Sequence, residues 1–285
     1  MKKLLYHFDT DPIPSVFDSV VAYDGGADHV TQLGGVNEEN CGGLVEGAIY
    51  TRAPKDKKNT AIFVGGSDLF AGQKLFQLVH DQFFQNFRVS VMLDSNGCNT
   101  TSAAGVALLS KATNLQGKTA VVLAGTGPVG QRAAVLLAIS GAKVRLTSRK
   151  QSRSVEACDE MHERFGVEMT PMQASDDDSI QTAMDGAHVV FGAAKAGIQL
   201  LNAKQWQDHP TLELIADVGT SQVLGFEGID MMDKNTERNG KIVFGGIGIG
   251  ALKLKLHRAC IAKLFESNDI ALDAELIYKI AQGMA

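Results

Sequence analysis

Short apolar runs alternate along this chain with longer segments whose apolar residues recur at helical spacing. The runs at 121–123 and 188–193 are rich in β-branched and aliphatic residues, as expected of strands buried on both faces of a parallel sheet. The amphipathic segments between such runs predict helices that cover the sheet. The pattern therefore predicts an α/β fold.

Two α/β domains are expected, because the alternation runs through both halves of a chain whose 285 residues suffice for two domains. The first half predicts strands at 3–8, 60–64 and 88–93, with helices at 15–23 and 68–84. The second half predicts strands at 121–123, 142–146, 167–172, 188–193, 212–218 and 241–244, with helices at 131–140, 154–165, 176–184 and 203–206.

We assign 1–102 and 270–285, which includes a helix at 273–284, to one domain. We assign 103–269 to a second domain, a doubly wound parallel sheet of the Rossmann type. The join falls in a predicted helix at 100–112, so we expect an interdomain cleft that acts as a hinge, and ligand chemistry at the carboxyl edge of the second sheet.

A glycine-rich turn stands between the strand at 121–123 and the helix at 131–140. It reads Gly125-Thr126-Gly127-Pro128-Val129-Gly130. Three glycines at this spacing permit a tight turn, close approach of the backbone to a pyrophosphate and close packing of helix on strand, while free N–H groups at the helix start face the phosphates. Because the turn lies within a β-α-β unit, it predicts a dinucleotide site, with a purely structural turn as the alternative.

The end of the next strand favours NADP over NAD. In an NAD site, an acidic residue about 20 residues past the glycine motif accepts a hydrogen bond from the ribose 2′-OH. This chain instead has Ser148, Arg149 and Lys150 there, with Arg153 nearby and no acid. A guanidinium can hold a 2′-phosphate through a two-point, charge-assisted contact, whereas a carboxylate would repel it. A solvated basic loop is the alternative.

Later strand ends supply three more candidate contacts to the dinucleotide. Ala194 follows the strand at 188–193, Val218 ends the strand at 212–218, and Gly248 lies in the glycine-rich segment 245–250 after the last strand. Glycine at alternate positions lets a loop approach a flat ring closely, so we expect this segment to cover the nicotinamide. A flexible connector is the alternative.

Composition argues against several other classes of protein. With 45% hydrophobic residues, 21% charged residues and a net charge of −5, the chain is typical of a soluble globular protein without a basic surface for nucleic acid. No uncharged apolar run reaches membrane-spanning length, and acidic residues interrupt the apolar start of the chain, so we expect a cytoplasmic protein. Cys41, Cys98, Cys158 and Cys260 are widely spaced, which favours reduced structural thiols over a zinc site or a disulfide framework. No metal is expected.

Six blocks that together span nearly the whole chain resemble one family. They are Phe8-Asp9-Thr10-Asp11, Pro14-Ser15-Val16-Phe17-Asp18, Tyr23-Asp24-Gly25-Gly26-Ala27-Asp28-His29, Met92-Leu93-Asp94-Ser95-Asn96-Gly97, the glycine motif at 125–130, and GIGALKLKLHRACIAKLFES at 248–267. The chain thereby resembles the bacterial NAD(P)-dependent methylenetetrahydromethanopterin dehydrogenases. The first and last blocks are far more specific than the glycine motif, which many dehydrogenases share.

The resemblance implies an N-terminal pterin-binding domain, an NADP-binding domain and a homo-oligomer. The implied reaction is the reversible oxidation of methylenetetrahydromethanopterin to the methenyl cation during formaldehyde oxidation, a step of methylotrophic one-carbon metabolism. Members of the family differ in their use of NAD or NADP and in their tolerance of tetrahydrofolate. NAD therefore remains possible, and the natural pterin remains open.

The implied chemistry needs no general base. The substrate carbon lies between two nitrogens whose lone pairs expel hydride and share the resulting positive charge, so no proton has to move. The protein then has to orient two rings and exclude water. A fixed carboxylate near the pterin-derived ring would favour its positive charge. The candidates for pterin contact or charge stabilisation are Asp18, Asp24 and Asp94, with Asp94 favoured for a catalytic role and Asn96 beside it for substrate binding.

Two further side chains are candidates for holding the pterin. Phe17 could stack on its ring, although an apolar helix position is more often part of a core. Lys253 could hold a pterin carbonyl or an acidic tail and take part in catalysis. If its segment is helical, Lys253 and Lys255 lie about 200° apart around the helix, so only one of them faces the substrate. A surface lysine is the alternative.

Two other functions compete with the dehydrogenase. One is a methenyl-pterin cyclohydrolase, alone or combined with methylenetetrahydrofolate dehydrogenase activity, which would need a positioned water and a proton-transfer partner such as Lys253. The other is a noncatalytic NADPH-binding regulator. The presence of a second domain of substrate-binding size disfavours the regulator.

Overall fold

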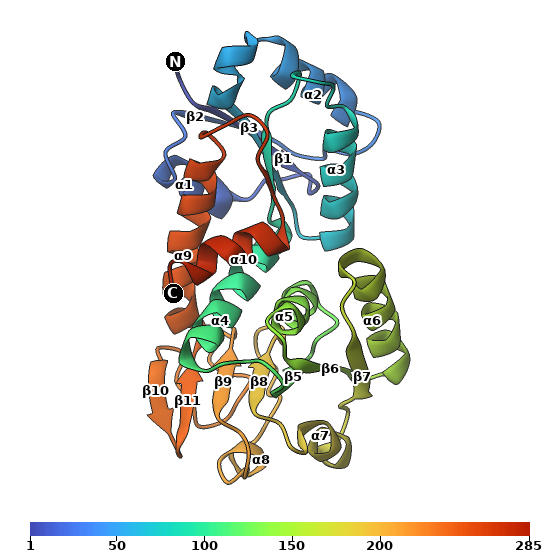
Figure 1. Cartoon of the computed structure of the whole chain (residues 1–285), viewed down its shortest axis with the longest axis vertical. Coiled ribbons are helices and arrows are strands. Elements are labelled where there is room, and N and C mark those ends of the chain that lie inside the picture. The colour runs from blue at the N-terminus through green and yellow to red at the C-terminus, as the bar shows by residue number, and fades with distance from the viewer. The chain divides into compact units, whose positions relative to one another are not determined.

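The computed structural model describes residues 1–285, which form two compact α/β units (Figure 1). The first unit consists of Met1–Thr100 and Leu254–Ile280, and the second of Thr101–Lys253 and Ala281–Ala285. Helices α4 (Cys98–Ala112), α9 (Gly246–Lys263) and α10 (Ala274–Gln282) divide between the two units, and the second unit takes only the last two residues of α10. The domain limits drawn from the sequence stay a prediction and differ from these units chiefly in placing 254–269 with the second.

The first unit is built on a five-stranded parallel sheet in the order β12-β4-β3-β1-β2. Its strands are β1 (Leu4–Asp9), β2 (His29–Leu33), β3 (Thr60–Gly65), β4 (Ser90–Leu93) and β12 (Ala271–Leu272). Its helices are α1 (Val16–Asp24), α2 (Cys41–Tyr50), α3 (Leu69–Asp81) and α10 (Ala274–Gln282), with 3-10 turns η1 (Pro54–Asn59) and η2 (Ser95–Gly97). Numbered by sequence, this strand order is 2-1-3-4-5, which places the topological switch point between β1 and β3, where such sheets bind ligands.

Buried side chains explain why these strands are central. Every residue of β3 and β4 is buried, and Phe8, Val64 and Leu93 belong to one core cluster. The other face of β1 carries His7 and Asp9, because side chains alternate along a strand. The switch point therefore has an apolar layer on one side and ionisable side chains on the other.

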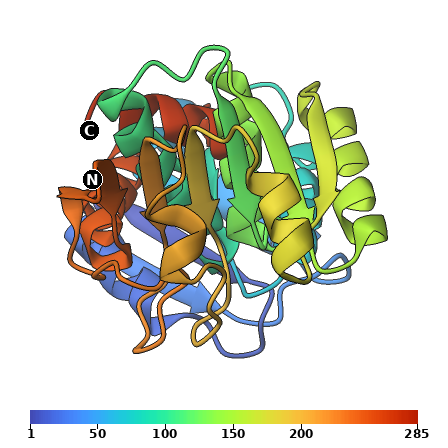
Figure 2. The ribbon, with the colours of Figure 1, turned by 90° about the horizontal axis from the view of Figure 1, so that it is seen from below.

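The second unit holds a seven-stranded sheet in the order β10-β11-β9-β8-β5-β6-β7, whose strands lie side by side in Figure 2. Its strands are β5 (Thr119–Leu123), β6 (Lys143–Ser148), β7 (Met169–Gln173), β8 (Val189–Gly192), β9 (Leu214–Asp217), β10 (Lys234–Arg238) and β11 (Lys241–Phe244). Its helices are α5 (Pro128–Ile139), α6 (Gln151–Phe165), α7 (Asp177–Met184) and α8 (Ala203–Trp206), together with parts of α4 and α9. The pairs are parallel except for β10 with β11. The parallel strands follow the order 3-2-1-4-5-6, which confirms the predicted Rossmann-type sheet and places its switch point between β5 and β8.

Several elements lie outside the predicted pattern. The helix α2 contains three glycines, each costing roughly 1 kcal/mol of helix propensity, and its burial of Cys41, Val45 and Ile49 stabilises it instead. Strands β2 and β10 are largely polar edge strands, and β12 has two residues, so none carries a strong strand pattern.

The expected loop at 245–250 was wrong, because α9 begins at Gly246. A Cβ on Gly245 would lie 2.1 Å from the Asp230 carbonyl oxygen, and one on Gly246 would lie 2.3 Å from the Gly219 carbonyl oxygen. The glycines therefore let the start of this helix pack against backbone. The segment around Lys253 is helical.

All four cysteines are buried free thiols. Burial raises the pKa of Cys158 to about 11, and the Asp159 carboxylate adds to the increase. Burial also raises the pKa of Cys260. Such thiols stay protonated and unreactive near neutral pH. No cluster of His, Cys, Asp and Glu is arranged to hold a metal ion, and none of the helices combines the length and the apolar character needed to cross a bilayer.

Candidate functional site

The glycine turn between β5 and α5 has the geometry that its spacing predicted. A Cβ on Gly130 would lie 2.7 Å from the Gly125 Cα, and one on Gly125 would lie 2.8 Å from the Leu146 Cγ. These two glycines therefore let α5 pack closely on the sheet. Gly127 differs, since a Cβ there would meet nothing within 4 Å. It faces open space at the N-cap of α5, where a phosphate group can approach the backbone.

A strained residue helps to hold this turn. Ala124 has a φ of +54°, a left-handed conformation that costs an L-residue roughly 1–2 kcal/mol. Next to it, the Gly125 N–H donates to the Thr147 carbonyl at 2.9 Å and ties the turn to the end of β6. The left-handed Ala124 thus bends the chain directly at the edge of a pocket that it also lines.

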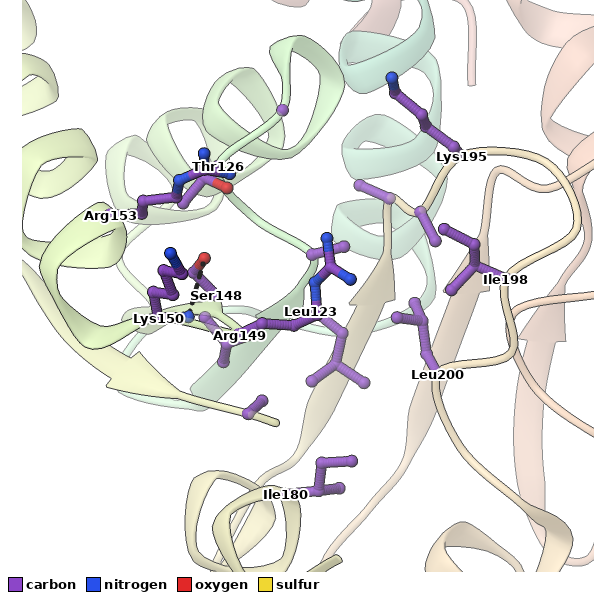
Figure 3. A pocket seen from close by; sticks show the side chains of 16 residues that line it. Leu123, Thr126, Ser148, Arg149, Lys150, Arg153, Ile180, Lys195, Ile198 and Leu200 are labelled. Atoms are coloured by element: carbon purple, nitrogen blue, oxygen red, sulfur yellow. Dashed lines mark hydrogen bonds between the residues drawn. The ribbon is translucent and has the colours of Figure 1, made fainter. Parts of the chain in front are cut away.

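This pocket has a volume of about 770 Å³ and lies at the carboxyl ends of β5, β6, β7 and β8 (Figure 3). Its lining residues are Leu123, Ala124, Thr126, Gly127, Thr147, Ser148, Arg149, Lys150, Arg153, Ala174, Ile180, Ala193, Ala194, Lys195, Ile198 and Leu200. Position and size fit a nucleotide, because the pocket opens at the switch point of the sheet.

Cationic side chains line both walls of the pocket. Arg149, Lys150 and Arg153 come from the segment after β6, and Lys195 comes from the opposite wall on the loop after β8 (Figure 3). The lining contains no aspartate or glutamate. In the same segment as the three cations after β6, the Lys150 N–H donates weakly to the Ser148 Oγ at 3.5 Å. The pocket can therefore hold a ligand that carries several phosphate charges.

The structure brings together many of the predicted nucleotide contacts. Those that line the pocket are Thr126, Gly127, Ser148, Arg149, Lys150, Arg153 and Ala194. Gly125, Pro128, Val129 and Gly130 belong to the turn and to the first turn of α5 without lining the pocket.

Two predicted contacts lie elsewhere in the second unit. A Cβ on Gly248 would lie 2.0 Å from the Asp233 carbonyl oxygen, so this glycine serves helix packing. Val218 starts a loop that folds back on Asp217, whose carboxylate accepts from the Gly219 and Gly225 N–H groups at 3.1 and 2.7 Å. Burial raises the pKa of Asp217, and its effect exceeds that of these hydrogen bonds, which lower the pKa. Neither Val218 nor Gly248 lines the pocket.

Sequence reasoning missed the apolar wall of the pocket. Ala174 and Ile180 follow β7, and Ile198 and Leu200 lie after β8. Nothing in these residue types marks a ligand contact. The adjacency of β7 to β6 in the sheet is the signal that could have found Ala174, and it depends on strand order.

A second group of polar residues lies at the switch point of the first unit. The Asp9 carboxylate accepts from the backbone N–H groups of Asp11 and Ser15 at 2.9 and 3.1 Å. Asp11 in turn accepts from both the N–H and the hydroxyl of Ser67, at 3.0 and 2.9 Å. The loops after β1 and β3 are thereby joined at the mouth of the switch point.

His7 completes this group from within β1. Its Nε2 lies 3.2 Å from the Asp9 Oδ2, and both side chains are 1% exposed. Burial raises the pKa of Asp9, but the contact with His7 and the N–H groups of Asp11 and Ser15 outweigh it and hold the pKa below its ordinary value. Asp9 is therefore a buried anion at neutral pH.

Asp94 is fully buried at the end of β4 and holds the start of α4. Its carboxylate accepts from the N–H groups of Asn99 and Thr100 at 2.9 and 3.0 Å and from the Thr100 hydroxyl at 2.6 Å. The His257 Nδ1 lies 3.9 Å from Asp94 Oδ2, the oxygen that accepts from the Thr100 hydroxyl. Asn96, next along the chain, is exposed in a left-handed conformation with a φ of +53°, and its N–H donates to the Gly66 carbonyl at 2.7 Å.

Aromatic rings extend from this cluster to α1. His257 stacks on Phe63 with ring centroids 5.5 Å apart and lies 6.4 Å from Phe17. Phe17 and Asp18 are in the first turn of α1, whose N-cap is Ser15. Phe17, Asp18, Asn96 and Asp94 thus gather at one edge of the first unit.

Asp24 does not join this group. It lies at the far end of α1, about 9 Å along the helix axis from Asp18 at 1.5 Å per residue, and pairs with Arg258 at 2.8 Å. Helices antiparallel to the strands carry their last residues to the opposite edge of the sheet, which is why the two acids separate. Lys253 lies in α9, half-buried, four residues before His257 and therefore on nearly the same side of the helix, whereas Lys255 is exposed.

Residues 16–96 match the family described as methylene-tetrahydromethanopterin dehydrogenase, N-terminal. The chain is 55% identical over 286 residues to the bifunctional protein MdtA of Methylorubrum extorquens, covering 100% of this chain and 99% of that protein. It is 28% identical over 281 residues to the NAD(P)-dependent methylenetetrahydromethanopterin dehydrogenase of the same organism, covering 95% of each. The fold is similar to that of shikimate 5-dehydrogenase from Listeria monocytogenes, solved with shikimate and NAD, with a TM-score of 0.58, 13% identity, and 98% and 96% of the two chains covered.

Proposed function

Because this chain belongs to the bacterial NAD(P)-dependent methylenetetrahydromethanopterin dehydrogenase family, we propose that it transfers hydride reversibly between methylenetetrahydromethanopterin and NADP. The product of the forward direction is methenyltetrahydromethanopterin. The substrate carbon lies between two nitrogens, whose lone pairs expel a hydride from that carbon to the nicotinamide and share the positive charge left behind. The chain therefore has to align the reacting rings and exclude water, rather than to move a proton.

The observation that carries the proposal is the pocket at the glycine turn, whose lining has four cations and no carboxylate. When bound, NADP supplies the nicotinamide ring that accepts or returns hydride. The backbone at Gly127 and the start of α5 would hold its pyrophosphate, since no side chain fills that space. Ser148, Arg149, Lys150 and Arg153 would hold the 2′-phosphate through charge-assisted hydrogen bonds.

The pterin side of the proposal uses the edge of the first unit. Phe17 would stack on the pterin, with Asp18 and Asn96 as its polar contacts. Lys253, which belongs to the second unit, stays a separate proposal for a contact to a pterin carbonyl or an acidic tail. Phe17 is about half exposed and Asn96 is exposed, so both can meet a ligand. Asp94 has its carboxylate occupied by the start of α4, and we propose that it positions this edge instead of contacting the substrate.

One spectrophotometric experiment tests the proposal. The protein is mixed with methylenetetrahydromethanopterin and NADP, and both the reduced nicotinamide and the methenyl product are followed. The same assay with NAD, and with methylenetetrahydrofolate in place of the methanopterin compound, measures both preferences. Absence of nicotinamide reduction with every pair would overturn the dehydrogenase. Decay of added methenyl compound without nucleotide would instead identify a cyclohydrolase.

The proposal extends to the setting of the enzyme. We place it in the cytoplasm as a homo-oligomer that serves formaldehyde oxidation, in line with its family. Analytical ultracentrifugation would test the assembly, and a strain lacking the protein should lose methenyl formation from supplied formaldehyde. A monomer, or unchanged methenyl formation in that strain, would contradict this part.

A further inference from the structure

Gln32 fixes which nitrogen of His7 carries the proton. The Gln32 side-chain NH₂ donates to the Ser15 carbonyl at 2.8 Å, and the same nitrogen lies 3.3 Å from the His7 Nδ1. Rotating the amide by half a turn would place its oxygen against the Ser15 carbonyl oxygen, so the Ser15 contact determines the amide orientation. Because the Gln32 nitrogen is a donor, the His7 Nδ1 must accept.

The proton of His7 therefore lies on Nε2. That nitrogen is buried against β3, where a Cβ on Gly65 would lie 2.5 Å from it. Its polar neighbour is the Asp9 Oδ2 at 3.2 Å, a long contact that is poorly aligned for an ideal hydrogen bond, and no other polar atom serves it. The N–H of His7 thus faces the Asp9 anion.

Asp9 and Gln32 both bind the backbone of Ser15, the residue that precedes α1. Asp9 accepts from the Ser15 N–H at 3.1 Å, and Gln32 donates to the Ser15 carbonyl at 2.8 Å. The Ser15 hydroxyl accepts from the Asp18 N–H at 3.2 Å and caps α1. The backbone of the N-cap is held from both sides, and the first turn of α1, which carries Phe17 and Asp18, follows directly from it.

We propose that His7 is a positioning residue for substrate binding, acting through Asp9, Gln32 and Ser15 on the first turn of α1. The inference rests on the proposed function, in which Phe17 and Asp18 contact the pterin. His7 itself is 1% exposed and does not touch the substrate. It orients the turn that does, and it should affect the pterin and not the nucleotide.

The test compares two substitutions of His7 in the full-length enzyme. His7→Phe keeps a ring beside Phe63, whose centroid lies 5.0 Å away, but removes both nitrogens. We expect the KM for the pterin to rise about tenfold, with the KM for NADP nearly unchanged, and the melting temperature to fall because Asp9 loses its buried partner. His7→Gln restores an amide N–H that can face Asp9 and should recover most of the pterin KM. An unchanged pterin KM in His7→Phe, or an equal rise in both KM values, would overturn the inference.

A second variant keeps the test decisive if His7→Phe folds poorly. Gln32 is exposed, so Gln32→Met should fold while removing the donor to both Ser15 and His7. We expect it to raise the pterin KM severalfold. In a Phe17→Ala background, where the stacking surface is already gone, Gln32→Met should add little, because groups acting through one contact are not additive. Full additivity would overturn the inference, whereas a wild-type enzyme without pterin oxidation would overturn the proposed function itself.

Discussion

Replacing Arg149 with alanine should weaken NADP binding about tenfold and leave NAD binding within about twofold. A hydrogen bond to a charged group contributes about 1.5–3 kcal/mol, and Arg149 shares its wall of the pocket with Lys150 and Arg153. These two cations partly replace the lost guanidinium, so we expect the lower limit, about 1.5 kcal/mol, or roughly a factor of ten. NAD lacks the 2′-phosphate and loses no such contact.

The assay is a titration of the protein with each oxidised cofactor, followed by calorimetry. Lys204→Ala is a matched control, because it removes a cation from α8, outside the pocket lining. The preference for NADP should also fall as salt is added, since exposed charges are screened at about 10 Å in 0.1 M salt. Equal losses of NADP and NAD in Arg149→Ala would refute the assignment of this wall to the 2′-phosphate.

Three other substitutions probe the two edges. Gly130→Ala places a methyl 2.7 Å from the Gly125 Cα, so we expect about 1–3 kcal/mol of destabilisation and weaker binding of both cofactors, measured by urea unfolding and titration; wild-type stability would contradict the packing role. Asp94→Asn can keep an oxygen facing the Asn99 and Thr100 N–H groups but places an NH₂ where the Thr100 hydroxyl now donates, and it should cost about 1–3 kcal/mol, with Asp24→Asn, at the exposed pair, as a nearly neutral control. Asp9 has a folded-state pKa below its unfolded value of about 3.9, so its stabilisation is complete above that pH and is lost as the pH falls through the folded pKa. Asp9→Asn should therefore flatten the acid limb of the unfolding free energy against pH, and parallel curves for the two proteins would exclude this linkage.

The nucleotide half of the molecule could be predicted in some detail. The β-branched run before Gly125 and the helix after Gly130 identify a β-α-β unit, and Ser148 and Arg149 follow the next strand at a fixed distance. Each of these signals is local, because it depends on residues that lie close together in the sequence within one β-α-β motif. Hence seven of the predicted contacts line the pocket, namely Thr126, Gly127, Ser148, Arg149, Lys150, Arg153 and Ala194.

The glycine-rich segment before α9 was misread for a physical reason. Glycine at alternate positions is compatible with a loop near a flat ring and equally with a helix end that packs on backbone. The choice depends on the carbonyl groups of Gly219, Asp230 and Asp233, which lie 15 to 27 residues before the glycines that they contact and meet the segment only after folding. Gly248 therefore belongs to packing.

The roles of the three candidate acidic residues of the first unit likewise depend on the tertiary structure. In the sequence, Asp18, Asp24 and Asp94 are all candidate carboxylates, and only the strand that ends at Asp94 favours it for a catalytic role. Their locations separate them: Asp18 lies in the first turn of α1, Asp24 pairs with Arg258 at its last residue, and Asp94 is buried under α4. Helix direction and burial, and not residue type, distinguish these three side chains.

By itself, the sequence determined the α/β alternation, the turn at Gly125 and the cations after β6, because these depend on neighbours along the chain. Tertiary structure alone decided the order of the strands. It thereby brought Gln32 of β2 against the His7 and Asp9 side chains of β1 at one edge, and Ala174 beside Arg149 at another. Strand order is set by the long-range burial of apolar faces, which no local pattern records. Parallel pairing then brings the carboxyl ends of distant strands together, and both candidate sites lie where they meet.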